Sequence, residues 1–138
     1  MSAPAVAVSA DGKKFAAAWK DVRTGTASVY WAVSDSLSFT EDSPIHRRLG
    51  VEQNHPSVAF DASGTISVAW EESHPQGQQI WIRSSLASDK GRAISDESDG
   101  WASFPVIASN GGLIGVVYET DNDGERGVAF RLIESGQE

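Results

Sequence analysis

Three stretches of the chain repeat one pattern of apolar and polar positions. Each opens with a proline, continues with apolar residues alternating with small ones, and closes at a glycine, over residues 4–12, 56–64 and 105–112. Alternation with a period of two is typical of a half-buried β-strand. The prolines lie 52 and 49 residues apart. The chain therefore contains an internal repeat of about 50 residues.

The spacing between the second and third runs is also the same in every repeat. The second run ends in an aromatic residue, and the third starts ten residues later in every copy: Trp19 and Val29, Trp70 and Ile80, Tyr118 and Val128. These runs are rich in β-branched and aromatic residues and bounded by Gly, Asp, Asn and Ser, which predicts strands. Turns at Gly12, Gly64 and Gly111 favour tight hairpins between the first two strands of each copy.

Four-stranded units that repeat in this way predict the blades of a β-propeller. A weaker fourth strand is expected at residues 45–49 and 92–95. The all-β fold expected is a single half-propeller domain over residues 1–138, with three antiparallel blades at 4–55, 56–104 and 105–138. Only 34 residues remain for the third blade, so its outer strand is expected to be missing.

Three blades do not close a ring, and open terminal blades expose apolar faces. Two completions are expected, and the sequence does not choose between them. A second copy of the chain would form a homodimer with a six-bladed ring. Alternatively, further blades of a longer polypeptide would complete it.

The second repeat carries the clearest family resemblance. Its Pro-x-Val-Ala-x-Asp-x-x-Gly, followed by Ala-Trp-Glu-Glu and Ile-Trp-Ile-Arg-Ser-Ser, resembles a blade of the sialidase-like propellers with BNR or Asp-box repeats. Residues 34–40 keep the Asp and the aromatic of an Asp box but lack its glycine, and residues 84–91 are a more degenerate copy. The resemblance implies six blades and favours a secreted or periplasmic location.

The same resemblance implies an arginine cluster, a Tyr–Glu nucleophile pair and an Asp acid/base. Those residues do not map onto this chain. Arg83 and Arg131 fall on third strands, far from the expected axis, and Tyr30 and Tyr118 lie inside strands and are interpreted as core. We therefore expect that any sialidase catalytic set lies outside this chain.

The composition argues against several classes of partner and of site. The net charge of −8, from 11 basic and 19 acidic residues, argues against nucleic acid or an anionic membrane surface. The longest apolar run, residues 15–19, is too short to span a bilayer, and residues 1–4 show no signal-peptide pattern. The absence of cysteine excludes disulfides and thiolate metal sites. His46, His55 and His74 lack metal-ligand spacing, so we expect no metal and no cofactor.

In a propeller, the loops between blades and those between second and third strands share one face. Here they are residues 20–28, 51–55, 71–79, 96–103 and 119–127. They carry the candidate ligand-binding residues Asp21, Arg23, His55, Glu71, Glu72, His74, Trp101 and Glu119. Trp101 could act as a stacking platform, and Glu71, Glu72 and Glu119 as acceptors or an acid/base pair. The structural interpretation is a turn cap at His55, inter-blade packing of Trp101, and glutamates at solvated loop edges.

Three functions remain open at this point. The first is a non-catalytic binding or scaffold module that presents an acidic, Trp-bearing face to a glycan, a peptide or a partner domain. The second is a glycoside hydrolase, with a composite dimer site or as part of a longer enzyme, which requires two convergent carboxylates. The third is a chain that serves assembly alone. The missing catalytic set favours the first.

Overall fold

The structure is a computed structural model that describes residues 3–35, 38–39, 41–46, 50–85 and 90–134. The first sheet contains β1 (Ala5–Val8), β2 (Phe15–Asp21), β3 (Ser28–Ser34) and β4 (Ser43–Pro44), in that order. The second repeats this order with β5 (Glu52–Phe60), β6 (Ile66–His74), β7 (Gly77–Ser84) and β8 (Arg92–Ala93). Neighbouring strands in both sheets are antiparallel.

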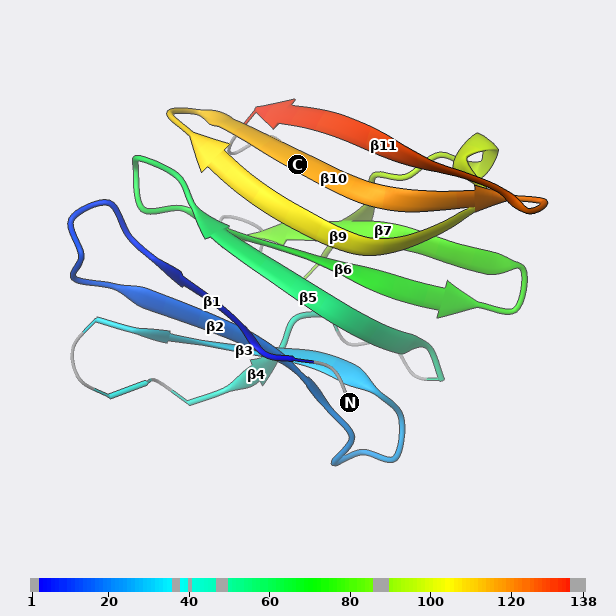
Figure 1. Cartoon of the computed structure of the whole chain (residues 1–138). Coiled ribbons are helices and arrows are strands. Elements are labelled where there is room, and N and C mark those ends of the chain that lie inside the picture. The colour runs from blue at the N-terminus through cyan, green and yellow to red at the C-terminus, as the bar shows by residue number, and fades with distance from the viewer. Residues whose placement is uncertain (1–2, 36–37, 40, 47–49, 86–89, 135–138) are drawn as a thin grey trace.

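The third sheet follows a single turn of 3-10 helix, η1 (Glu97–Asp99). It contains β9 (Trp101–Asn110), β10 (Leu113–Asn122) and β11 (Glu125–Glu134). β10 pairs antiparallel with β11, and β9 runs along the other side of β10 (Figure 1). The all-β prediction is confirmed, and the described part of the third repeat has three strands.

The strands are longer than the apolar runs that predict them. β6 continues past Trp70 to His74, and β10 continues past Tyr118 to Asn122. The expectation of loops beginning at Glu71 and Glu119 is therefore wrong. The fourth strand of the first repeat lies at Ser43–Pro44, ahead of the expected 45–49, of which residues 47–49 lie outside the described part. The expected strand at 92–95 is present as β8.

The sheets are stacked in chain order, with two apolar cores between them (Figure 1). The first core joins the first and second sheets and contains Trp70, which is fully buried. The second core joins the second and third sheets and contains Tyr118. Both tyrosines are buried, as predicted. The inner strands β1, β5 and β9 lie next to one another, as blades around an axis require.

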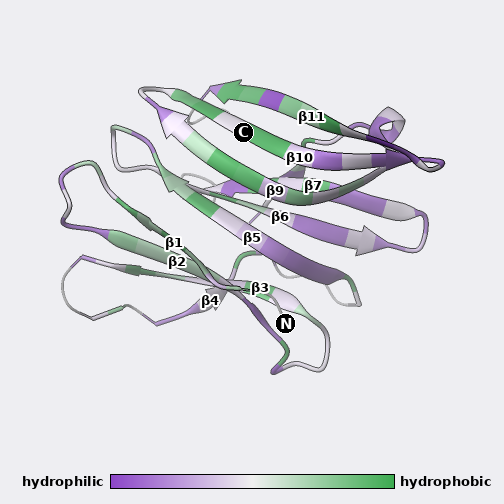
Figure 2. Ribbon diagram, in the orientation of Figure 1, coloured by the Kyte–Doolittle hydropathy of each residue, from purple (hydrophilic) through white to green (hydrophobic). Residues whose placement is uncertain are grey.

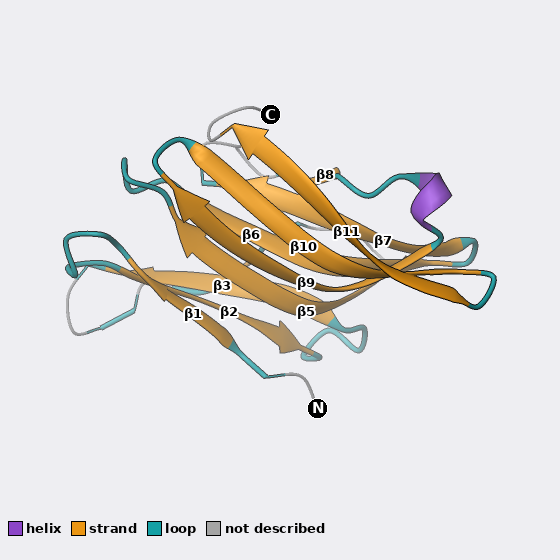
Figure 3. Ribbon diagram, turned by 45° about the horizontal axis from the view of Figure 1, so that its top comes forward, coloured by secondary structure: helices purple, strands orange, loops and turns teal. Residues whose placement is uncertain are grey.

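Antiparallel order sends the connections to two opposite ends of the molecule. The hairpins β1–β2, β5–β6 and β9–β10 lie at one end, and their Gly12, Gly64 and Gly111 have positive φ, as the turn signals predict. The hairpins β6–β7 and β10–β11 lie at the other end together with η1 (Figure 3). Among the described residues, no helix has the length and apolar character needed to cross a membrane.

Candidate functional site

A hollow of about 660 Å³ opens between the second and third sheets, and we call it the inter-sheet hollow. The β6–β7 hairpin forms one wall, and the segment from η1 to the start of β9 forms the other. Two indoles, one imidazole, three amides and two carboxylates line it: Trp81, Trp101, His74, Gln76, Gln78, Gln79, Asp96 and Glu97. This lining suits a small ligand that has both apolar faces and hydroxyl groups.

The wall at η1 is held by reciprocal hydrogen bonds. The Asp96 side chain accepts the Ser98 N–H at 2.9 Å, and the Asp96 N–H donates to the Asp99 carboxylate at 2.8 Å. This is a capping box. The donor from Ser98 lowers the pKa of Asp96 below its ordinary value, because it stabilises the carboxylate. Asp96 is therefore negatively charged at neutral pH.

Asp99 fastens this wall to the third sheet. Its Oδ2 accepts the Tyr118 hydroxyl at 2.7 Å and an Arg131 N–H at 2.9 Å. The Asn122 amide also donates to the Ser98 carbonyl at 3.1 Å. Burial, followed by the bond to Asp99, raises the pKa of Tyr118 above its ordinary value, so the hydroxyl remains a donor.

Gly100 allows η1 to lie against β10. Its φ is 71°, and a Cβ atom at this position would collide with the Asp121 carbonyl oxygen. Gly100 and Asp121 also form a parallel β-bridge. A larger residue at Gly100 would therefore displace the wall of the hollow.

Gln78 joins the two walls at the base of the hollow. Its Nε2 donates to the Ala102 carbonyl and to the Ser103 hydroxyl, both at 2.9 Å. Its Oε1 accepts the Ser73 hydroxyl at 2.9 Å. One amide thus ties β7 to β9 and sets the width of the hollow.

Glu71 lies deeper in the same junction. Its Oε2 accepts the Phe104 N–H at 2.7 Å and lies 2.9 Å from His55 Nδ1. His55 and Phe104 each precede a proline and have positive φ, 49° and 54°, and their ring centroids are 4.6 Å apart. Left-handed backbone is unfavourable for such residues. One buried carboxylate therefore lies against both strand irregularities and satisfies the N–H of Phe104.

The predicted glutamates do not share an environment. Glu71 and Glu72 are buried within β6, so the expectation of solvated loop edges is wrong for both. Glu119 is exposed on β10, on the face of the third sheet that points away from the second sheet. The third sheet therefore lies between Glu71 and Glu119.

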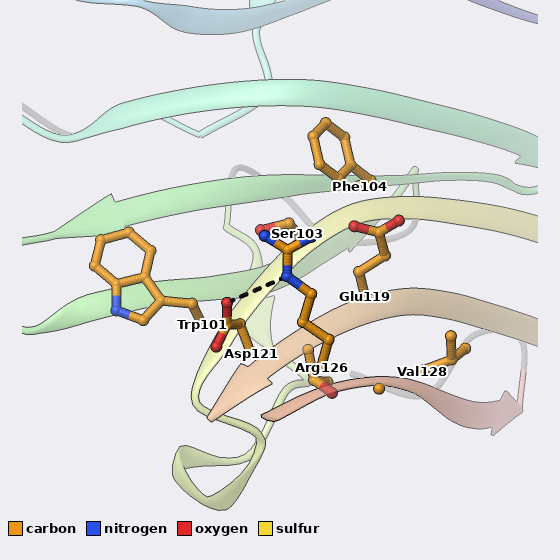
Figure 4. Close-up of a pocket in the computed structure, with 9 residues that line it drawn as sticks. Trp101, Ser103, Phe104, Glu119, Asp121, Arg126 and Val128 are labelled. Atoms are coloured by element: carbon orange, nitrogen blue, oxygen red, sulfur yellow. Dashed lines mark ion pairs between the residues drawn. The ribbon is translucent and has the colours of Figure 1, made fainter. Parts of the chain in front are cut away.

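A second hollow, of about 480 Å³, lies on that outer face, and we call it the outer hollow. Glu119 points into it beside Arg126, whose Nε lies 3.7 Å from Asp121 Oδ2 (Figure 4). Phe104 and Val128 supply apolar lining. Trp101 lines both hollows.

The predicted residues of the first sheet form a separate cluster. Arg23 bonds Asp21 at 2.6 Å and both Asp42 carboxylate oxygens at 3.1 Å, and its guanidinium lies 4.3 Å from the Tyr30 ring centroid. Hydrogen bonds from Arg23 hold the pKa of Asp21 well below its ordinary value. Neither Asp21 nor Arg23 lines either hollow.

The structure thus brings His74 and Trp101 to one hollow, pairs His55 with Glu71, and leaves Asp21 with Arg23 elsewhere. Sequence reasoning missed Gln78 and the positive φ of Phe104. The X-Pro dipeptide gave no signal for the latter, because a residue before proline is ordinarily extended. Among the described residues, no group of three His, Asp or Glu side chains is placed to hold a metal ion.

Comparison with known proteins identifies the fold. No protein-family model and no curated protein matches the sequence. Among solved structures, the chain is similar to a GH43 endo-arabinanase from Bacillus licheniformis, at 14% identity and a TM-score of 0.60. It is also similar to a thermostable family-43 glycoside hydrolase, at 17% identity and a TM-score of 0.64. These matches cover 96% and 97% of this chain but 51% of each of those chains, so it spans about half their length.

A third similar structure is a fucose lectin from Kordia zhangzhouensis in complex with methyl-fucoside. The identity is 10% and the TM-score 0.59, and the match covers 98% of this chain and 99% of the lectin chain. All three neighbours are β-propellers, so the chain has a propeller-type fold. The resemblance to sialidases stays a prediction, since parts of both Asp-box copies, residues 36–37, 40 and 86–89, lie outside the described residues.

Proposed function

We propose that the chain is a non-catalytic carbohydrate-binding module of the propeller class, and that the inter-sheet hollow binds the sugar. The observation that carries the proposal is the lining of that hollow. Trp101 is 53% exposed at its rim, next to the glutamine amides and the Asp96 and Glu97 carboxylates. A sugar ring presents C–H groups on its faces and hydroxyls around its edge, which match an indole and polar acceptors.

The solved neighbours support the ligand class. One is a lectin bound to methyl-fucoside whose chain this one covers almost completely, and two are glycoside hydrolases. The volume of about 660 Å³ lies within the range of small-molecule sites. Gln78 and the η1 anchors hold both walls in position before any ligand arrives, which reduces the entropic cost of binding.

Catalysis is not part of the proposal. Glycoside hydrolysis requires an acid and a base or nucleophile about 5–9.5 Å apart on opposite sides of the scissile bond. Glu71 is enclosed between two sheets, and Glu119 faces away from it. Asp96 and Glu97 are adjacent on one turn, so they approach a ligand from the same side.

Calorimetric titration with methyl-fucoside and with short arabinan oligosaccharides, followed by a glycan array, tests the proposal. We expect saturable binding of at least one sugar. Trp101→Ala and Glu97→Gln are each expected to weaken it about tenfold, which corresponds to about 1.4 kcal/mol. Arg126→Ala is the control, because Arg126 lines the outer hollow alone.

Three results would contradict the proposal. The first is an array on which no sugar binds. The second is binding that Arg126→Ala abolishes and Glu97→Gln leaves intact, which would place the ligand in the outer hollow. The third is release of new reducing ends from the oligosaccharides, which would show that the module is catalytic.

A further inference from the structure

The outermost face of the first sheet consists of residues whose repeat equivalents are buried. Val6 on β1 and Phe15 on β2 are 68% and 37% exposed. The equivalents of Val6 are Val58 and Ile107, and those of Phe15 are Ile66 and Ile114; all four are buried against the preceding sheet. The first sheet thus carries the face that the second and third sheets use to dock.

The outermost face of the third sheet shows the converse. Val128 and Phe130 on β11 are 73% and 55% exposed, and the ribbon of β11 carries hydrophobic segments on either side of a hydrophilic one (Figure 2). Their repeat equivalents, Ile80 and Ile82, are buried in the second core against the following sheet. The third sheet therefore carries the face that receives a following sheet.

Each internal junction also contains polar contacts, which different groups form in the two junctions. In each junction, residues at the start of β5 or β9 form hydrogen bonds with the preceding sheet, close to the hairpin between its second and third strands. In the first junction, the Gln53 N–H donates to the Ala27 carbonyl at 2.9 Å. In the second, Gln78 bonds Ala102 and Ser103, and Glu71 accepts the Phe104 N–H.

The repeat equivalents of Gln78 and Glu71 in the third sheet are Arg126 and Glu119. Both line the outer hollow, with Glu119 exposed (Figure 4). On the second sheet, the corresponding space is filled by the start of β9. The outer hollow therefore has the position and the chemistry of a socket for an inner strand.

We propose that the outer face of the third sheet binds the outer face of the first sheet of a second copy, head to tail. In this junction Glu119 accepts the N–H of the second copy's Ala3. Ala3 precedes Pro4 in the first repeat, as Phe104 precedes Pro105 in the third. Val128 and Phe130 pack on the second copy's Val6 and Phe15. Because each copy carries both faces, two copies form two identical junctions about a twofold axis. The resulting ring has six sheets, within the range of known propellers.

The solution mass of the chain across a dilution series, by sedimentation equilibrium, tests the proposal. We expect a species of twice the 14.7 kDa chain mass. Val6→Asp and Phe130→Asp each place a charge on one face, and each is expected to give a folded monomer. Val22→Asp is the matched control, because Val22 is a valine on the β2–β3 turn, 61% exposed and outside both faces. Circular dichroism and cooperative thermal unfolding establish that each variant is folded.

Mixing the two monomeric variants separates a head-to-tail junction from a symmetric one. Val6→Asp keeps an unaltered third sheet, and Phe130→Asp keeps an unaltered first sheet. These two faces can form one intact junction in the mixture, so we expect the mixture to regain the dimer mass. A parent chain that stays monomeric at every concentration would overturn the proposal. So would species larger than a dimer, a dimer that one of the two variants leaves intact, or a mixture that stays monomeric. None of these variants alters the inter-sheet hollow, so sugar binding is tested independently.

Discussion

At the residue scale, the junctions depend on a few enclosed side chains with specific partners. Trp70 fills the first core, where its ring lies 6.3 Å from that of His46 and where a Cβ on Gly91 would come within 2.5 Å of it. In the second junction, Glu71 supplies a polar contact by accepting the N–H of Phe104. Both residues act through burial, and neither contacts the proposed ligand site.

Trp70→Ala is expected to lower the free energy of unfolding by about 3–5 kcal/mol, because such tight packing leaves a cavity that cannot close. Urea denaturation measures the change. Trp101→Ala serves as the comparison, since its exposed indole predicts a loss of no more than about 0.5 kcal/mol. Equal stability of Trp70→Ala and the parent would refute the packing assignment.

Glu71→Leu is expected to cost about 1–3 kcal/mol, because it leaves the Phe104 N–H without its acceptor in a buried junction. Glu71→Gln retains a side-chain oxygen and is expected to cost less. Denaturant unfolding of the three proteins measures the difference. A Leu variant as stable as the Gln variant would show that the hydrogen bond is not what holds β9 in place.

At the element scale, periodicity predicted the strands well and their ends poorly. The apolar run that ends at Trp70 predicted β6, but the interpretation of Glu71 and Glu72 as loop is wrong, because hydrophobic periodicity does not mark a strand that continues through polar residues. Phe104 and His55, which contact Glu71, are too distant in sequence for a local pattern to reveal. Part of the lining of the inter-sheet hollow was predicted for the same reason. Trp101 and His74 were candidate residues, whereas Gln78, which bridges two sheets, was not.

We expect the attachment of η1 to depend on pH. Tyr118 has a raised pKa when folded, so the folded chain keeps this proton at pH values where the unfolded chain loses it. The stabilisation is therefore complete below about pH 10 and declines as the pH rises above it. Tyr118→Phe is expected to lower the unfolding midpoint at about pH 8, and the difference from the parent should shrink by about pH 11. A difference that is constant across this range would contradict the role assigned to the hydroxyl.

At the scale of the whole molecule, the three stacked sheets form one hollow between the second and third sheets and leave the outer faces of the first and third sheets exposed. The inter-sheet hollow has both walls within one chain, so sugar binding by a single copy is consistent with the geometry. The outer hollow has a wall on one side alone, formed by the third sheet. Head-to-tail pairing would close that side and would bury the exposed Val6, Val128 and Phe130 in the same step.

The central claim, a propeller module that binds sugar between its second and third sheets, is tested most directly by a crystal structure with a bound saccharide. The crystals would be soaked with methyl-fucoside or with the sugar that binds best on the array. We expect density against the Trp101 indole, between the β6–β7 hairpin and η1, with hydroxyls within hydrogen-bond distance of Asp96 or Glu97. Density in the outer hollow, or at a place that contacts neither tryptophan of the inter-sheet hollow, would contradict it.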